Sequence, residues 1–145
     1  MLKKIDHIGF AVHSIAEACV FYEQVLGLTC EGIGEVAAQK VRTAFFRLGE
    51  TCLELLEPTA PDSPVARFLD KRGEGIHHIA YLSDDLERDL ERARQQGCTL
   101  INPEPVAGAG GKAIAFLHPR STHGVLTELC SETGPAGKEA KEEIL

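Results

Sequence analysis

The chain has 145 residues, of which 43% are hydrophobic and 26% are charged, and its formal net charge is -7. These values are typical of one globular domain and exclude a disordered or membrane-spanning chain. The acidic balance also argues against nucleic acid as a partner, which requires a basic face. Five cysteines without a C-x-x-C pair and an N-terminus without a signal-peptide cleavage site predict a cytoplasmic protein with reduced thiols.

The first half of the chain predicts a β-α-β-β-β unit. A strand with alternating side chains runs from Ile5 to Val12. A helix over 15–26 follows, which Ser14 caps and Gly27 ends. Strands are then expected over 28–32, 39–48 and 51–56, the last two joined by a turn at Gly49-Glu50.

The second half predicts the same order of elements. A proline-rich crossover over 58–74, with a short helix over 65–71, leads to a strand around His78. A helix over 86–96, capped by Asp84 or Asp85, precedes strands expected over 99–101, 112–117 and 125–130. The glycine-rich run 108–112 is expected to be a mobile loop, and the tail 132–145 carries a short helical pattern at 138–145.

The two halves also repeat each other in sequence. Ile76-His77-His78-Ile79 matches Ile5-Asp6-His7-Ile8 at an offset of about 71, and Thr127-Glu128-Leu129 matches Leu53-Glu54-Leu55 at about 74. We therefore predict an α+β fold in which two βαβββ modules, about 4–57 and 75–131, share a curved sheet within a single domain over 1–145. A module this small buries too little surface to be stable alone.

Four polar residues, His7, Glu54, His78 and Glu128, occupy equivalent positions in the two modules. Pairing of the modules about a pseudo-two-fold axis would bring them to one cleft, where two imidazoles and two carboxylates suit a divalent transition metal with open positions. Taken one at a time, His7 could be a surface histidine at the end of a strand, and Glu54 and Glu128 could be charged residues of edge strands. Their coincidence, and the cost of burying a mid-strand carboxylate without a partner, favour the metal site.

The remaining histidines predict no site: His77 and His118 are expected to make structural hydrogen bonds, and His13 and His123 to lie in loops. The glycine-rich run lacks the spacing and following helix of a P-loop. Lys112 beside it is a candidate contact for a ligand phosphate.

Several motifs in order resemble a known family. They are D-H-I-G-F-A-V, E-L-L-E-P-T, D-S-P-V-A-R-F-L, G-E-G-I-H-H-I-A, G-A-G-G-K and F-L-H-P-R-S-T-H-G-V-L-T-E-L, between Ile5 and Cys130. The chain resembles the methylmalonyl-CoA epimerases of the vicinal oxygen chelate superfamily, which have the glyoxalase fold. The resemblance implies an acyl-CoA substrate, a homodimer and a divalent metal held by the four residues. Cobalt is the expected metal, with nickel, manganese, zinc and magnesium as alternatives.

The implied reaction inverts C2 of methylmalonyl-CoA by proton abstraction and reprotonation through an enolate, with Glu128 as a metal ligand that also transfers a proton. The family mechanism uses a second base, and some members carry it as Glu where this chain has Thr43. Glu35, Lys40 or a water held by Gln39 are the candidate replacements. Gln39, Lys40 and Lys112 are also the expected substrate contacts.

Three other functions compete with this interpretation. A glyoxalase I-type lactoylglutathione lyase uses the same four ligands on a glutathione adduct. A non-catalytic binding member of the superfamily need not keep the ligands, so the intact set argues against it. A ring-cleaving dioxygenase would need a two-histidine, one-carboxylate iron site and further acid-base residues, usually in a longer chain.

Overall fold

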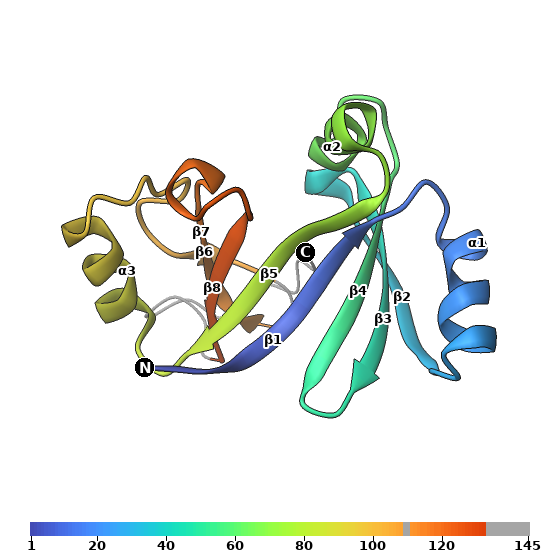
Figure 1. Ribbon diagram of the computed structural model, residues 1–145, viewed down its shortest axis with the longest axis horizontal. Helices are drawn as coiled ribbons and strands as arrows, with labels where there is room; N and C mark the ends of the chain where they lie inside the picture. The colour runs from blue at the N-terminus through green and yellow to red at the C-terminus, as the bar shows by residue number, and fades with distance from the viewer. Residues whose placement is uncertain (109–110, 133–145) are drawn as a thin grey trace. The chain divides into compact units, whose positions relative to one another are not determined.

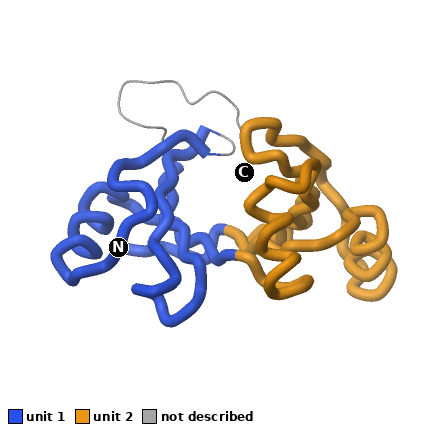
Figure 2. Tube along the Cα trace, turned by 90° about the horizontal axis from the view of Figure 1, so that it is seen from above, with its two compact units in different colours: residues 1–6, 78–144 blue, residues 7–77, 145 orange. Residues whose placement is uncertain are grey.

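The computed structural model describes residues 1–108 and 111–132, which form two compact units (Figure 2). One unit contains residues 7–77, and the other contains residues 1–6 together with the described residues from 78 onward. The helix expected over 138–145 and positions 109–110 of the glycine-rich run lie outside the described residues. The boundaries predicted for modules, crossover and tail stay a prediction.

The unit of residues 7–77 contains a sheet with the strand order β2-β3-β4-β1 (Figure 1). Neighbours β2 and β3, and β3 and β4, are antiparallel, whereas β1 and β4 are parallel. The register places Gly9 of β1 opposite Glu54 of β4. The strands are β1, Leu2–Ala11, which enters this unit at residue 7; β2, Cys30–Val36; β3, Val41–Leu48; and β4, Thr51–Pro58.

The other unit repeats this order as β6-β7-β8-β5. Neighbours β6 and β7, and β7 and β8, are antiparallel, and β5 and β8 are parallel. In both units the first strand of the sequence repeat therefore pairs with the last, which confirms the predicted βαβββ repeat. The strands are β5, Gly75–Ser83, which enters this unit at residue 78; β6, Val106–Ala107; β7, Ala113–Leu117; and β8, Thr127–Ser131.

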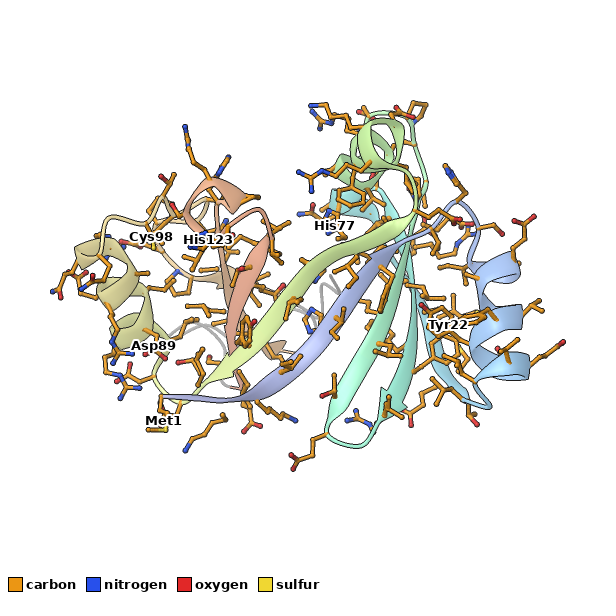
Figure 3. The ribbon with its side chains drawn as sticks, in the orientation of Figure 1. Met1, Tyr22, His77, Asp89, Cys98 and His123 are labelled. Carbon is orange, nitrogen blue, oxygen red and sulfur yellow. The ribbon has the colours of Figure 1, made fainter. Side chains whose placement is uncertain are left out.

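Helix α1, Ile15–Val20, covers one face of the first sheet and is shorter than predicted. The Ser14 side chain caps it by accepting the Glu17 N–H, as expected. The chain then widens into a π-helical turn, Phe21–Val25, and Tyr22 from this turn stacks on Phe46 with ring centroids 5.4 Å apart (Figure 3). The core under the helix consists of Val12, Ile15, Ala44, Phe46 and Leu55.

Helix α3, Leu86–Gln95, covers the corresponding face of the other sheet, and helix α2, Pro64–Arg72, lies in the connection before β5. The Asp85 side chain caps α3 by accepting the Arg88 N–H at 3.1 Å. Beneath α3 the core consists of Leu86, Leu90, Ala113, Ala115, Leu117 and Leu129. Each helix thus buries one apolar stripe, and the opposite face of each sheet is left for other side chains.

The strand predicted over 99–101 is wrong. Leu100 forms only an isolated bridge to Leu117, and the pairing strand lies later, at Val106–Ala107. The Asn102 side chain accepts the Phe116 N–H at 2.9 Å, and Pro103 has no N–H to donate, so the backbone ladder cannot continue through this segment.

Among residues 1–108 and 111–132, the helices are too short or too polar to cross a membrane.

Candidate metal-binding residues

His7 and Glu54 meet on one face of the sheet of residues 7–77. Leu53 and Leu55 of β4 turn toward the core under α1, so Glu54 between them turns to the opposite face. There His7 Nε2 lies 3.8 Å from Glu54 Oε2. Both residues are buried, and Glu54 is only 1% exposed. The parallel pairing of β1 with β4 therefore places one imidazole beside one carboxylate, away from bulk water.

His78 and Glu128 form the equivalent pair in the other unit. His78 Nε2 lies 4.0 Å from Glu128 Oε1, and Glu128 is 1% exposed. The register places Ala80 of β5 opposite Glu128 of β8, as Gly9 lies opposite Glu54 in the first unit. The Phe116 ring packs edge-on against the His78 ring, with centroids 5.7 Å apart.

The distances within the two pairs fit ligands of a metal. At 3.8 and 4.0 Å, the nitrogen and oxygen atoms are too far apart for a direct hydrogen bond. Two ligand atoms each about 2.1 Å from one ion lie at most about 4.2 Å apart. Imidazole nitrogen and carboxylate oxygen are also donors that divalent transition metals accept. Each pair, taken alone, therefore has suitable donors at a suitable separation.

Lys112 has a protein partner that the sequence did not reveal. Its Nζ lies 2.6 Å from Asp6 Oδ1, and both side chains are largely withdrawn from solvent. Burial opposes the charged ammonium, but the hydrogen bond and charge of Asp6 outweigh it and raise the pKa of Lys112. Burial, with the nearby charges of Asp6 and Glu128, raises the pKa of the Cys130 thiol to about 12. Lys112 and Asp6 lie 106 positions apart in the sequence, so no local pattern links them.

Gln39 and Lys40, the other expected substrate contacts, lie exposed at the turn before β3. Lys40 has a positive φ of 52° and pairs with Asp62, whose pKa this hydrogen bond lowers. Glu35 of β2 lies opposite Arg42 of β3 and so shares its face. That face is opposite to the one that carries Glu54, which disfavours Glu35 as the second base.

Thr43 lies on the same face as Glu54. Phe45 pairs directly with Glu54 across β3 and β4, and Thr43 is two residues from Phe45 on the same strand. Thr43 is completely buried, and its Oγ1 has no hydrogen-bond partner among the described residues.

Of the two histidines predicted to make structural hydrogen bonds, His118 confirms the prediction, and for His77 the structure shows ring packing. The His77 ring packs edge-on against Phe68 of α2, with centroids 5.1 Å apart, and burial lowers its pKa to about 4 (Figure 3). His118 Nδ1 accepts the Arg120 N–H at 3.0 Å and caps a short 3-10 helix. His13 and His123 lie outside the helices and strands.

The chain is similar to several known proteins. A family model described as the Glyoxalase/Bleomycin resistance protein/Dioxygenase superfamily matches residues 6–116. The uncharacterised protein YqjC of Bacillus subtilis is 50% identical over 92% of this chain and 95% of its own. The mitochondrial methylmalonyl-CoA epimerase of Dictyostelium discoideum is 35% identical over 87% of this chain and 76% of its own.

A solved structure extends the comparison to three dimensions. It is a variant of Streptomyces coelicolor methylmalonyl-CoA epimerase in complex with 2-nitronate-propionyl-CoA. The two chains are 39% identical, the match covers 90% of this chain and 98% of the other, and the TM-score is 0.85. These similarities confirm the predicted fold class and the resemblance seen in the sequence motifs.

Proposed function

The chain belongs to the Glyoxalase/Bleomycin resistance protein/Dioxygenase superfamily, and from this membership we propose that it is an epimerase that interconverts the C2 epimers of methylmalonyl-CoA. The observation that carries the proposal is the buried histidine and glutamate pair on equivalent strands of both units. The activity named for the Dictyostelium relative supplies the substrate. An acidic carbon next to a thioester requires a base and a means of stabilising an enolate.

We propose that His7, Glu54, His78 and Glu128 together hold one divalent metal ion. Cobalt is our first choice, with nickel, manganese, zinc or magnesium as alternatives, because two nitrogens and two oxygens leave positions open for substrate. When bound, such an ion supplies Lewis-acid stabilisation of negative charge on the substrate oxygens, worth several kcal/mol. Support comes from the donor types and the 3.8 and 4.0 Å separations within the pairs.

Glu128 is our candidate for moving the proton at C2. Its carboxylate is buried beside His78, and the Phe116 ring packs against that histidine, so these side chains limit the access of water. A carboxylate shielded in this way can remove a proton without competition from solvent. Gln39 and Lys40 are our candidates for contacts with the CoA portion, since both are exposed. Lys112 would have to leave Asp6 before it could reach a phosphate.

We also propose that the protein is a cytoplasmic homodimer. All five cysteines are free, which suits a reducing compartment. Phe21, Val25 and Leu26 leave about half or more of their surface exposed near the end of α1, and a second copy would cover such a surface. Light scattering at micromolar concentration should give twice the mass of the chain, and a monomer there would contradict the dimer.

One experiment tests the proposed function. Purified protein is analysed for metal and assayed on racemic methylmalonyl-CoA, with a coupled enzyme that consumes only one epimer. We expect one metal per chain and complete consumption of the racemate, because epimerisation feeds the consumed form. Consumption that stops at half would contradict the proposal. Turnover of the glutathione hemithioacetal instead would assign the chain to the glyoxalase I reaction.

A further inference from the structure

The hydroxyl of Thr43 is a buried polar group that the described protein does not satisfy. Thr43 lies in the middle of β3 and is 0% exposed, and its Oγ1 has no hydrogen-bond partner among the described residues. Buried side-chain hydroxyls in native structures nearly always have a partner, so an exception calls for a physical reason. A ligand that supplies the missing partner is one such reason.

The neighbours of Thr43 place it on the face of the sheet that also carries Glu54 of the same unit. Across the sheet Thr43 lies opposite Leu56 of β4 and Gly34 of β2, and residues directly opposite in antiparallel strands share a face. That face also carries Glu54, which pairs with Phe45. Gly34 contributes no side chain, and a side chain added at Gly32, two residues earlier, would meet nothing within 4 Å. Open space is therefore present on this face of β2 at Gly32, two residues along the strand from the partner of Thr43.

Shape alone does not account for a threonine at this position. Valine has the same branched form and the same preference for strands, and it would fill the same volume without burying a hydroxyl. A buried hydroxyl without a partner destabilises the protein relative to such an apolar replacement. Without a partner the hydroxyl lowers stability, and a bound ligand that accepts its hydrogen bond would account for its presence.

We propose that Thr43 contacts the substrate and donates its hydroxyl hydrogen bond to an oxygen of the acyl group that gains negative charge during the reaction. This inference rests on the proposed epimerase function. A hydroxyl is a donor and a neutral acceptor, whereas a carboxylate is an acceptor and a base. Thr43 therefore stabilises charge and does not carry a proton from C2. The second proton transfer of the reaction must therefore use another group.

The test compares three variants of the protein, each with a single substitution. Thr43→Val removes the hydroxyl and keeps the shape, Thr43→Ser keeps the hydroxyl, and Thr51→Val makes the same change in a strand threonine at the start of β4. We expect kcat of Thr43→Val to fall about 10²-fold, the order of loss when one donor to a developing oxyanion is removed. Thr43→Ser should recover most of it, and Thr51→Val should match the wild type.

Stability and metal content separate a ligand contact from a structural role. Thr43→Val should melt at the same temperature as the wild type or higher, because it removes an unsatisfied buried group. It should also keep the full metal content. A lower melting temperature, loss of metal, or a kcat within about twofold of the wild type would each overturn the inference.

A binding measurement separates the failure of this inference from the failure of the proposed function. Malonyl-CoA has no stereocentre at C2, so its affinity does not depend on epimerisation. If the wild type is inactive on methylmalonyl-CoA, the proposed function fails. Calorimetry with malonyl-CoA then decides the inference: weaker binding by Thr43→Val than by the wild type supports the contact, and equal binding, or none by either protein, overturns it.

Discussion

Glu54 of β4 lies 3.8 Å from His7 of β1, at the place in its unit that Glu128 occupies beside His78 in the other. If these four side chains hold one metal, removing a histidine ligand should release it. We expect His78→Ala to lose metal and activity together. His77→Ala, one residue away but turned to the opposite side of β5, should keep the metal. Elemental analysis of both variants checks this, and full metal in His78→Ala would disprove the assignment.

Replacing Glu128 by Gln separates its two proposed roles. Gln keeps the shape and one metal-binding oxygen but has almost no basicity, so the variant should retain much of the metal and lose proton transfer. Removal of a general base typically costs about 10²–10⁴-fold. The measurement is exchange of the C2 hydrogen with deuterated water, followed for each epimer separately.

The outcome of that exchange experiment depends on which face Glu128 serves. If it serves one face of the substrate, exchange from one epimer should fall far more than from the other. Small and equal losses for both epimers, with metal retained, would exclude Glu128 as a base.

The ion pair of Lys112 with Asp6 should contribute to stability. Replacing Lys112 by Met removes a hydrogen-bonding cation from the buried Asp6 carboxylate, and we expect a loss of about 1–3 kcal/mol in the free energy of unfolding. Lys40→Met is the matched control, because its pair with Asp62 is exposed and screened by solvent, so its loss should change stability little. Urea denaturation measures both, and equal effects of the two substitutions would contradict the prediction.

The pH dependence of the Lys112 contribution follows from its raised pKa. A cation whose pKa is raised on folding stabilises the protein fully below the ordinary value of 10.5. The stabilisation is lost as the pH rises through the raised value in the folded state. The difference in unfolding free energy between wild type and Lys112→Met should therefore be constant from pH 7 to 9 and shrink in stronger alkali.

His77 should make the protein sensitive to acid. Burial against Phe68 lowers its pKa from 6.5 to about 4, so the unfolded chain binds the proton more readily than the folded one. The neutral imidazole's contribution is present above pH 6.5 and is lost as the pH falls toward 4. His77→Phe should remove this part of the acid sensitivity, on the order of 2 kcal/mol between pH 7 and 4. Thermal melts across this range check it, with His118→Phe as the comparison.

Much of the fold could be predicted because the relevant signals are local or repeated. Alternation in Ile5–Val12 and in β4 correctly separated the side chains that face the core from those beside Glu54. Ser14 and the aspartates at 84 and 85 marked the helix starts, and Asp85 is the cap. The weakest prediction was the segment around Leu100, where one side-chain acceptor and a proline end the strand pairing.

The sequence by itself determined the repeat, the β-α-β-β-β order of elements along each half and the equivalent histidines and glutamates, because periodicity and equivalence between halves survive without coordinates. The order of strands within each sheet came from the structure. Only the tertiary structure decided which partners distant residues have. It joined Lys112 to Asp6, turned Glu35 away from Glu54, and left the Thr43 hydroxyl buried without a partner among the described residues. Such pairings depend on strand register and on burial, which arise from the whole packed chain and leave no trace in local sequence.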